Sequence, residues 1–201
     1  RWFLQKRYWL ESYRLMRIIS GTLKGRSINF LKNKNTRPLK DSVRESIFNI
    51  LKHSRLIKIN IEKSRVLDLY SGVGSFGIEC LSRGAEKVSF VEQDLDAAKI
   101  LKSNLLKLCI LKKTNIYIKT TDNYLMEDIK EKFNIFFLDP PYADTDFFQS
   151  LQLIKEKKIF EKNNLIIIHR EKKTDEDFKS FLKIIETKYY GRSKIIFGII
   201  N

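Results

Sequence analysis

The segment DLYSGVGSFG, residues 68–77, lies directly between two apolar stretches of the chain. Val66–Tyr70 is short and apolar, which predicts a buried strand, and Ser75–Arg83 has the spacing of a helix. The first two glycines would allow a tight turn and a close approach of the backbone to a ligand, and the third would allow the helix to pack closely on the strand. The segment therefore predicts a strand–turn–helix unit with a ligand site at its turn.

Strands alternate with helices from residue 65 onward. The predicted strands are Val66–Tyr70, Lys87–Glu92, Asn115–Thr120, Asn134–Asp139 and Asn164–His169, and the predicted helices are Ser75–Arg83, Leu95–Lys107, Asp122–Lys132, Asp144–Lys158 and Asp175–Ile185. Two consecutive strands, Glu186–Tyr190 and Lys194–Ile200, follow. This order predicts βαβ units with helices on both faces of the sheet. We therefore predict an α/β, Rossmann-like domain over residues 61–201, with a seven-stranded, mostly parallel sheet and a terminal antiparallel hairpin.

Positive charge is concentrated in the first third of the chain. The whole chain carries 39 Lys and Arg against 24 Asp and Glu, a formal net charge of +15. Residues 1–60 hold 15 of the basic and 3 of the acidic residues, so their net charge is +12, and residues 61–201 carry the remaining +3. Overuse of lysine in a low-GC genome would spread charge along the whole chain. The asymmetry therefore favours a partner with a phosphate backbone.

The basic region is predicted to contain a hairpin and a helix. Arg17–Ile19 and Arg26–Phe30 are strand-like around two glycines, and Thr36–Pro38 is a breaker. A capping-box pattern at Ser42–Glu45 begins a helical pattern that ends near His53. We predict that these elements form a small basic N-terminal extension, spanning residues 16–60, that contacts RNA or DNA.

Residues 1–15 are basic and aromatic and contain no Met. They are candidates for a targeting arm, an RNA-binding arm or upstream sequence translated in error, and they could be disordered; we expect the working protein to begin at Met16. No apolar run approaches the ~20 residues of a membrane span, and no secretory signal is recognisable. Cys80 and Cys109 lie in apolar helical patterns, which predicts buried thiols in a reducing compartment and no metal site. We expect a cytoplasmic protein without membrane association.

The glycine loop fits two classes of cofactor. Glu92 ends the second strand, where a carboxylate can accept both ribose hydroxyls of a nucleotide, so the pattern fits a nicotinamide dinucleotide as well as S-adenosylmethionine. Asp68 favours S-adenosylmethionine, because a carboxylate there would attract the ammonium of the methionine moiety and repel a pyrophosphate. Asp122, after the third strand, could accept from the adenine amino group or cap the next helix. The candidate cofactor-binding residues are Asp68, Ser71, Gly72, Gly74, Glu92 and Asp122.

The tetrad Asp139-Pro140-Pro141-Tyr142 follows the fourth predicted strand. Ligands bind at the carboxyl ends of strands in open α/β sheets, and the two prolines make a rigid turn. Asp139 and the carbonyl of Pro140 could each accept one N–H of an exocyclic base amine, which frees the nitrogen lone pair for methylation and stabilises the developing positive charge. Tyr142 could stack on a base that is flipped or single-stranded. The alternative is a Pro-Pro strand stop with an ordinary rim tyrosine.

These motifs resemble one known family, the bacterial 16S rRNA guanine-N2 methyltransferases of the RsmD type. The resemblance runs from Met16 to about Ile195. The matching stretches are MRIISG at residues 16–21, KGR at 24–26, TRP at 36–38, VRE at 43–45, FNIL at 48–51, DLYSGVG at 68–74, LSRGA at 81–85, FVE at 90–92, FLDPPY at 137–142 and YG at 190–191. The N-terminal motifs are more specific than the glycine loop and the tetrad, which many amino-methyltransferases share. The chain departs from the family at Leu39-Lys40, Ser42 and the Gly198 end of the last strand.

The resemblance implies a class I methyltransferase fold and the transfer of one methyl group from S-adenosylmethionine to N2 of guanine 966 of 16S rRNA, in small-subunit ribosome maturation. It also implies rRNA within a 30S subunit or assembly intermediate as the partner, and we expect a monomer. Catalysis is expected from Asp139, Pro140 and Tyr142. The expected phosphate contacts are Arg17, Lys24, Arg26, Arg37 and Arg44. His53 and His169 are expected to be structural or exposed.

Three other functions remain open from the residues alone. The tetrad would serve an adenine-N6 methyltransferase acting on RNA or DNA equally well, although no DNA target-recognition domain is recognisable. The glycine loop would serve a nicotinamide-dependent oxidoreductase. A non-catalytic rRNA-binding assembly factor could keep the same fold, but the intact Asp139 and Gly72 argue against it.

Overall fold

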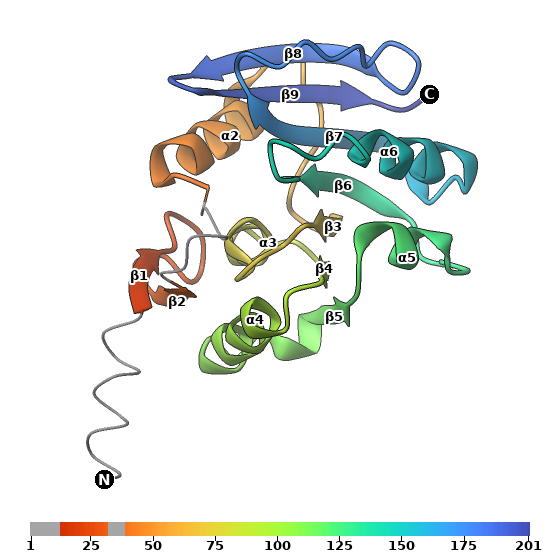
Figure 1. The fold of residues 1–201 in the computed structure, drawn as a ribbon. Coiled ribbons are helices and arrows are strands. Elements are labelled where there is room, and N and C mark those ends of the chain that lie inside the picture. Colours follow the sequence, from red (N-terminus) through yellow and green to blue (C-terminus); the bar gives the residue numbers. More distant parts are fainter. Residues whose placement is uncertain (1–12, 32–38) are drawn as a thin grey trace, which may run out of the picture.

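The computed structural model describes residues 13–31 and 39–201. Seven strands of this part form one sheet: β3 Arg65–Leu69, β4 Lys87–Glu92, β5 Thr114–Ile118, β6 Phe133–Leu138, β7 Phe160–Glu171, β8 Lys183–Tyr190 and β9 Ser193–Ile199. Their order in space is β5-β4-β3-β6-β7-β9-β8 (Figure 1). The strands from β5 to β7 run parallel, and β9 is antiparallel to both β7 and β8. The predicted α/β, Rossmann-like sheet with a terminal antiparallel hairpin is confirmed.

In the described part of the chain, five α-helices cover the two faces of the sheet. They are α2 Asp41–His53, α3 Ser75–Ser82, α4 Leu95–Lys107, α5 Thr121–Met126 and α6 Phe147–Glu156, and a single 3-10 turn, η1 Leu111–Lys113, precedes β5. Figure 1 shows α2, α3 and α4 on one side of the sheet and α5 and α6 on the other. The strand order reverses between β3 and β6, because β4 and β5 extend the sheet in one direction and β7 in the other. Such a switch point is where open α/β sheets bind ligands.

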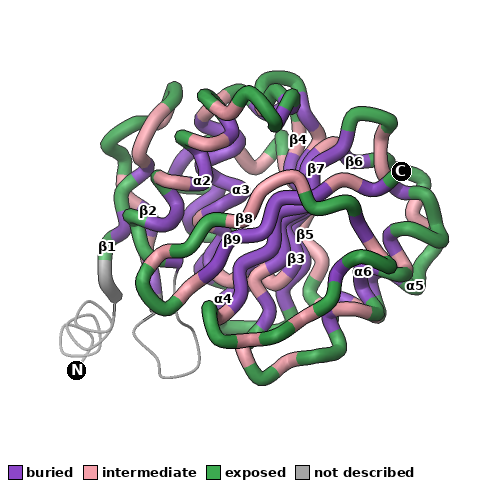
Figure 2. The backbone as a smooth tube through the Cα atoms, turned by 90° about the horizontal axis from the view of Figure 1, so that it is seen from above, coloured by how far each residue is buried: buried purple, intermediate pink, exposed green. Residues whose placement is uncertain are grey.

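Two hydrophobic cores fill the spaces between sheet and helices. Phe48, Phe76 and Leu101 represent the core under α2, α3 and α4, and Leu125 and Leu151 represent the core under α5 and α6. Successive strand residues point to opposite faces of the sheet, so every strand of the sheet except β8 contributes to both cores. The inner strands β3, β4, β6 and β9 are accordingly buried along nearly their whole length (Figure 2), whereas the edge strands β5 and β8 are half-buried or exposed.

The N-terminal extension begins with a two-stranded hairpin, β1 Tyr13–Arg17 and β2 Ser27–Leu31. The second strand matches its prediction within one residue, but β1 lies earlier than the predicted Arg17–Ile19 and crosses the boundary drawn after residue 15. The backbone N–H groups of Ile19 and Ser20 donate to the buried carboxylate of Glu79 on α3, at 2.8 and 3.0 Å. These two residues therefore dock the hairpin on the main domain and are unavailable for strand pairing.

The predicted helix at Asp175–Ile185 is wrong. Residues 172–182 form turns and irregular backbone, and Lys183–Tyr190 forms β8. Phe178 and Leu182 are buried against the α5–α6 side, so the apolar spacing that looked helical reflects burial in a loop. Pairing of β8 with β9 claims the end of the segment, and such tertiary contacts routinely override helical propensity.

Two local predictions also fail. No capping box begins α2, because the helix already starts at Asp41 after Lys40, whose side chain makes no capping bond. Ser42 lies inside the first turn. Cys80 is buried as predicted, but Cys109 is exposed and adopts a φ of +60° just after the end of α4.

None of the helices within residues 13–31 and 39–201 has the length and apolar character needed to cross a membrane.

Candidate active site

A cavity of about 650 Å³ opens at the carboxyl ends of the strands, beside the switch point between β3 and β6. Loops after β3, β4, β5 and β6 form its walls, and Phe30, Leu39 and Val43 close it from the N-terminal extension. Eight of the nine predicted catalytic and cofactor residues line the cavity: Asp68, Ser71, Gly72, Glu92, Asp122, Asp139, Pro140 and Tyr142. The fold thus gathers residues that are up to 74 positions apart in the sequence.

The glycines of the loop have two different roles: some allow close packing, and one leaves space at the cavity. Gly74, the ninth predicted residue, is absent from the lining; a Cβ on it would lie 2.4 Å from Leu101 of α4. A Cβ on Gly77 would lie 2.3 Å from Phe90 of β4, so this glycine allows the close helix–strand packing that was predicted. Gly72 has a φ of +54° and open space where its Cβ would be. Only Gly72 therefore leaves its backbone open to a ligand.

Asp68 presents an unfilled hydrogen-bond acceptor. Its side chain is 1% exposed, and its Oδ2 accepts from the N–H of Gly77 at 3.0 Å. Its Oδ1 is buried and has no hydrogen-bond partner within the described part of the chain. Burial, with a further contribution from the charges of Asp139 and Glu92, raises the pKa of the Asp68 carboxyl well above its usual range. A cationic ligand donor at Oδ1 would satisfy this atom and offset the burial of its charge.

Glu92 is held by backbone groups at the end of β4. Its Oε2 accepts from the N–H of Gly72 at 2.6 Å and its Oε1 from that of Asp94 at 2.8 Å. Each carboxylate oxygen can accept a second hydrogen bond, so the pair of oxygens could still receive two ribose hydroxyls. The hydroxyl of Ser71, by contrast, donates to the carbonyl of Val91 at 3.1 Å, so this side chain fastens the loop to β4.

Asp122 lies in the first turn of α5, on the wall of the cavity opposite the glycine loop. The alternative that it caps this helix is wrong, because Thr120 is the N-cap and its hydroxyl accepts from Asn123. Asp122 instead accepts from the hydroxyl of Ser150 at 3.1 Å. Beside it, Tyr70 adopts a φ of +63°, an unusual conformation for a tyrosine, and burial raises its pKa to about 12. Strained backbone of this kind clusters at functional sites.

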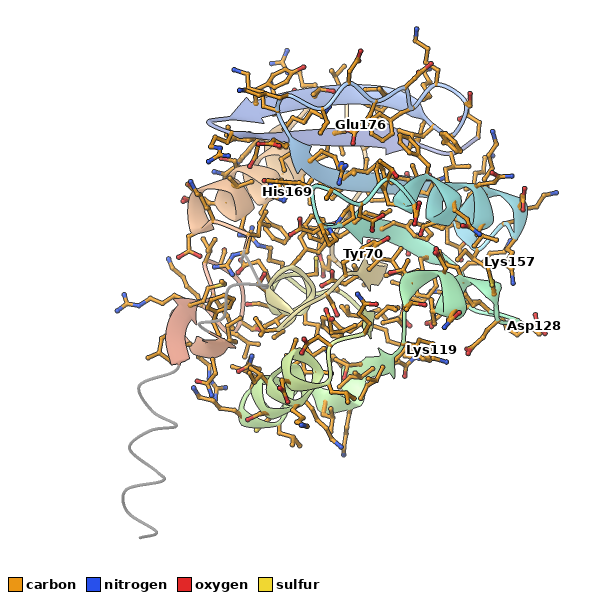
Figure 3. The ribbon with its side chains drawn as sticks, in the orientation of Figure 1. Tyr70, Lys119, Asp128, Lys157, His169 and Glu176 are labelled. Atoms are coloured by element: carbon orange, nitrogen blue, oxygen red, sulfur yellow. The ribbon has the colours of Figure 1, made fainter. Side chains whose placement is uncertain are left out.

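The tetrad side chains are joined by a histidine from the neighbouring strand. The Nδ1 atom of His169 lies 2.7 Å from Oδ1 of Asp139, and its Nε2 atom lies 3.4 Å from the hydroxyl of Tyr142. The Tyr142 hydroxyl also lies 3.2 Å from Oγ of Ser193 on β9. Figure 3 shows His169 on β7, above Tyr70 at the end of β3. Three strands of the sheet therefore contribute to the immediate surroundings of the tetrad.

Arg170 holds the backbone of the loop that carries the tetrad. Its guanidinium is 1% exposed and donates to three backbone carbonyls, those of Pro141 at 3.0 Å, Tyr142 at 3.1 Å and Asp144 at 3.0 Å. Its Nε donates to the carboxylate of Glu176 at 2.6 Å, which balances the buried charge. One buried cation thus fixes the course of the loop.

The carbonyl of Pro140 differs from those of its neighbours. No hydrogen bond to it is formed within residues 13–31 and 39–201, and Pro140 lines the cavity next to Asp139. Oδ2 of Asp139 is likewise free of hydrogen bonds to the described residues, since His169 engages Oδ1. The site therefore offers two adjacent acceptors, one carboxylate oxygen and one carbonyl oxygen, to a group that carries two N–H donors.

Among the charged residues that line the cavity, carboxylates outnumber cations, although the chain as a whole is strongly basic. Within residues 13–31 and 39–201, seven Asp and Glu residues line it, against two lysines, Lys40 and Lys119. This lining suits a ligand with a sulfonium and an ammonium group, and it would repel a pyrophosphate. The unfilled acceptor on Asp68 fits the same cation. The residues present therefore fit S-adenosylmethionine and disfavour a nicotinamide dinucleotide.

The predicted phosphate contacts fare differently from one another. Arg17, Lys24 and Arg26 are exposed on the extension, and Arg37 lies outside the described residues. Arg44 is 1% exposed, and its guanidinium donates to the carbonyl of Arg17 at 2.6 Å. The expectation that Arg44 contacts phosphate is wrong, because α2 turns this side chain inward, where it ties the hairpin to the helix.

Sequence reasoning misses His169, Arg170 and Tyr70. The expectation that His169 is structural or exposed leaves out its contacts with Asp139 and Tyr142. One signal in the sequence indicated these contacts. His169 ends the predicted strand that follows the strand of the tetrad, and the carboxyl ends of parallel strands lie at the same edge of a sheet. Nothing in the sequence indicates the role of Arg170, because the carbonyls that it binds belong to the backbone.

Known proteins are similar to this chain in sequence and in fold. The protein family described as Conserved hypothetical protein 95 matches residues 16–199. YlbH of Bacillus subtilis is 37% identical over 162 residues, 80% of this chain and 85% of that protein. The protein named Ribosomal RNA small subunit methyltransferase D of Buchnera aphidicola is 36% identical over 156 residues, 78% of each chain. A crystal structure of a Haemophilus influenzae methylase, at 29% identity, superposes with a TM-score of 0.74 and covers 92% of this chain and 98% of that one. With this fold, this site and these relatives, the chain belongs to the RsmD-type family of class I methyltransferases.

Proposed function

We propose that this chain transfers a methyl group from S-adenosylmethionine to the exocyclic N2 of a guanine in 16S rRNA, at position 966 in the usual ribosomal numbering. Membership of the RsmD-type family supports the general part of this statement, methylation of rRNA with S-adenosylmethionine. The observation that carries the amine chemistry is the pair of free acceptors, Oδ2 of Asp139 and the carbonyl of Pro140, at the mouth of the acidic cavity.

The two acceptors address the difficulty of methylating a base amine. The nitrogen lone pair is delocalised into the ring, so the amine is a weak nucleophile. If Asp139 and Pro140 each accept one N–H, the nitrogen is drawn toward tetrahedral geometry and its lone pair faces the methyl donor. The carboxylate also stabilises the positive charge that develops on nitrogen, and it can accept the proton released afterwards. Tyr142, which lines the cavity, would stack on the flipped base.

The cofactor is assigned to the other end of the cavity. S-adenosylmethionine supplies an electrophilic methyl on its sulfonium, so no activation of the methyl group is required from the protein. Asp68 would accept from the ammonium, Glu92 from the ribose hydroxyls and Asp122 from the adenine amino group. The backbone at Gly72 leaves space for the methionine moiety to pass. These residues bind and orient the two reactants and exclude water between them.

The exposed basic residues of the extension suit an RNA partner. We assign rRNA contact to residues 16–60, with Arg17, Lys24 and Arg26 on the surface and Arg37 as a further candidate, and we expect the substrate to be rRNA within a 30S subunit or assembly intermediate. The chain is proposed to act as a cytoplasmic monomer. The hairpin and α2 also close the cavity with Phe30 and Val43, so RNA bound to the extension would lie next to the tetrad.

The direct test is methyl transfer in vitro with identification of the modified nucleoside. The purified chain is incubated with labelled S-adenosylmethionine and with 30S subunits that lack the modification, and the digested RNA is analysed by mass spectrometry. We expect N2-methylguanosine from the wild type and none from Asp139→Ala, which should still bind the cofactor. Asp128→Ala is the matched control, because Asp128 is 78% exposed and lies at the far edge of the molecule from His169 (Figure 3). N6-methyladenosine would contradict the guanine assignment, and an active Asp139→Ala variant would contradict the role of the tetrad.

A further inference from the structure

We propose that His169 is a positioning residue for the methyl transfer: it fixes the Asp139 carboxylate through Nδ1–H so that only Oδ2 is offered to the base amine. The inference rests on the proposed function in assuming that Asp139 receives an amine, but it holds for a guanine or an adenine target. The notable feature is the place of His169, which is 8% exposed, lines the cavity and contacts both polar side chains of the tetrad.

The geometry selects one tautomer of the imidazole. Nδ1 lies 2.7 Å from a carboxylate oxygen, and an unprotonated Nδ1 would place two lone pairs against each other. Nδ1 therefore carries the proton and donates to Asp139. Nε2 is then the acceptor of the neutral ring, and the Tyr142 hydroxyl, at 3.4 Å, donates to it. The Ser193 hydroxyl, at 3.2 Å, can in turn donate to the Tyr142 oxygen.

This chain of hydrogen bonds restricts the rotation of the Asp139 carboxylate. The terminal torsion of an Asp side chain is broad, so a free carboxylate exposes either oxygen at many orientations. The donor at His169 occupies Oδ1 and thereby fixes the carboxylate plane. The backbone of β7 holds the histidine, because Ile168 pairs with Leu138 of β6 and His169 itself pairs with Ile195 of β9. Two rigid strands therefore aim the acceptor, which is the arrangement that orientation-dependent catalysis requires.

Tyr142 is held by the same group. Its ring meets the imidazole edge to face, with centroids 5.8 Å apart and planes at 70°, while its hydroxyl is bound by His169 and Ser193. A base that stacks on Tyr142 therefore meets a ring whose position is coupled to the carboxylate. His169 sets the spacing between the stacking surface and the acceptor of the amine proton.

The test compares three variants that separate the two nitrogen atoms. The amide nitrogen of His169→Asn can occupy the place of Nδ1, that of His169→Gln can occupy the place of Nε2, and His169→Ala keeps neither. We expect kcat for methyl transfer to fall about 10- to 100-fold in His169→Gln and His169→Ala, with unchanged affinity for S-adenosylmethionine, and to stay within about 3-fold in His169→Asn. A purely structural role would lower the melting temperature of all three and would not distinguish Asn from Gln.

A second measurement does not depend on activity. The chain has only two histidines, so long-range nitrogen–proton NMR of the wild-type protein resolves both rings, and His169→Asn assigns them. We expect the Nδ1–H tautomer at His169 near neutral pH. The Nε2–H tautomer, wild-type kcat in His169→Ala, or equal losses in the Asn and Gln variants would each overturn the proposal. A modified nucleoside other than N2-methylguanosine would overturn the proposed function alone, since the ratios between variants and the tautomer would still test His169.

Discussion

At the scale of single residues, Asp68 is expected to lower the stability of the free protein and to bind the cofactor. Its carboxyl is buried beside two other acids, and one of its oxygens has no partner in the described part of the chain. Such an arrangement is unfavourable in the free protein and becomes favourable when a cation binds. The sequence predicted the position of this carboxylate from the glycine loop. Its burial and its unfilled oxygen depend on Gly77 and on the neighbouring strands, which no local pattern reveals.

Asp68→Asn should therefore have opposite effects on stability and on binding. The unfolded carboxyl ionises near pH 4, whereas burial raises the pKa of the folded one, so the free energy of unfolding of the ligand-free protein falls as pH rises between the two values. The variant lacks this loss and should be at least as stable as the wild type at neutral pH. Its affinity for S-adenosylmethionine should fall about 10- to 100-fold, because a charged hydrogen bond is lost. Melting curves with and without cofactor measure both quantities; an unchanged cofactor-induced shift would contradict the assignment.

At the scale of elements, the hairpin depends on one glycine at its contact with α3. Gly21 has a φ of +83°, and a Cβ on it would lie 1.8 Å from the carbonyl oxygen of Ser82. Gly25 has nearly the same φ, +81°, but open space beside it. Gly21→Ala should therefore destabilise the protein by about 1–3 kcal/mol more than Gly25→Ala, and it should loosen the wall of the cavity formed by Phe30. Chemical denaturation of the two variants measures the difference, and equal losses would show that the close approach is unimportant.

The loop that carries the tetrad depends on a buried ion pair. Arg170→Met would leave three carbonyls without their donor and would weaken the neutralisation of Glu176, which retains Lys194 at 3.2 Å. We expect a loss of about 3–5 kcal/mol in the free energy of unfolding, as for other broken buried pairs. Arg192→Met is the control, because Arg192 is 77% exposed and its pair with Glu171 should contribute less than about 1 kcal/mol. Similar losses in the two variants would contradict this account of the loop.

The same scale shows where prediction from sequence succeeds and where it fails. β4 and α4 have the bounds predicted for them, because the local sequence decides both: β4 is short and rich in Val and Phe, and α4 has helical spacing after an Asp94 cap. The segment at residues 175–185 misled because its apolar residues are buried by contacts with other elements, β9 and α6. Arg44 misled in the same way: its charge predicted the surface, whereas its contact with Arg17 depends on how α2 meets the hairpin. The sequence predicted structure that depends on patterns within one element, but it did not predict contacts between elements.

At the scale of the whole molecule, charge is divided between two surfaces. The extension carries exposed Arg17, Lys24 and Arg26, while acidic residues outnumber basic ones among the described residues that line the cavity. A basic surface beside an acidic cavity would bind the RNA backbone outside and the cationic cofactor inside. This division explains how a protein with a net charge of +15 can hold a positively charged cofactor.

The exposed cations should act on binding and not on chemistry. Lys24→Ala and Arg26→Ala should each weaken RNA binding and reduce the slope of log K against log salt by about 1, with little change in kcat at saturating RNA. Lys162→Ala is the control, because Lys162 is exposed near the start of β7, at the opposite end of the sheet from the cavity. Binding titrations at several salt concentrations measure the slopes. Equal slopes in all three variants would place the RNA elsewhere.

The reaction proposed for this chain is the methylation of N2 of one guanine in 16S rRNA. It is tested most directly by nucleoside mass spectrometry of 16S rRNA from cells with the gene, without it, and with Asp139→Ala in its place. We predict N2-methylguanosine at position 966 only where the wild-type gene is present. The same methylation in all three strains, or the loss of a different modified nucleoside without the gene, would contradict the claim.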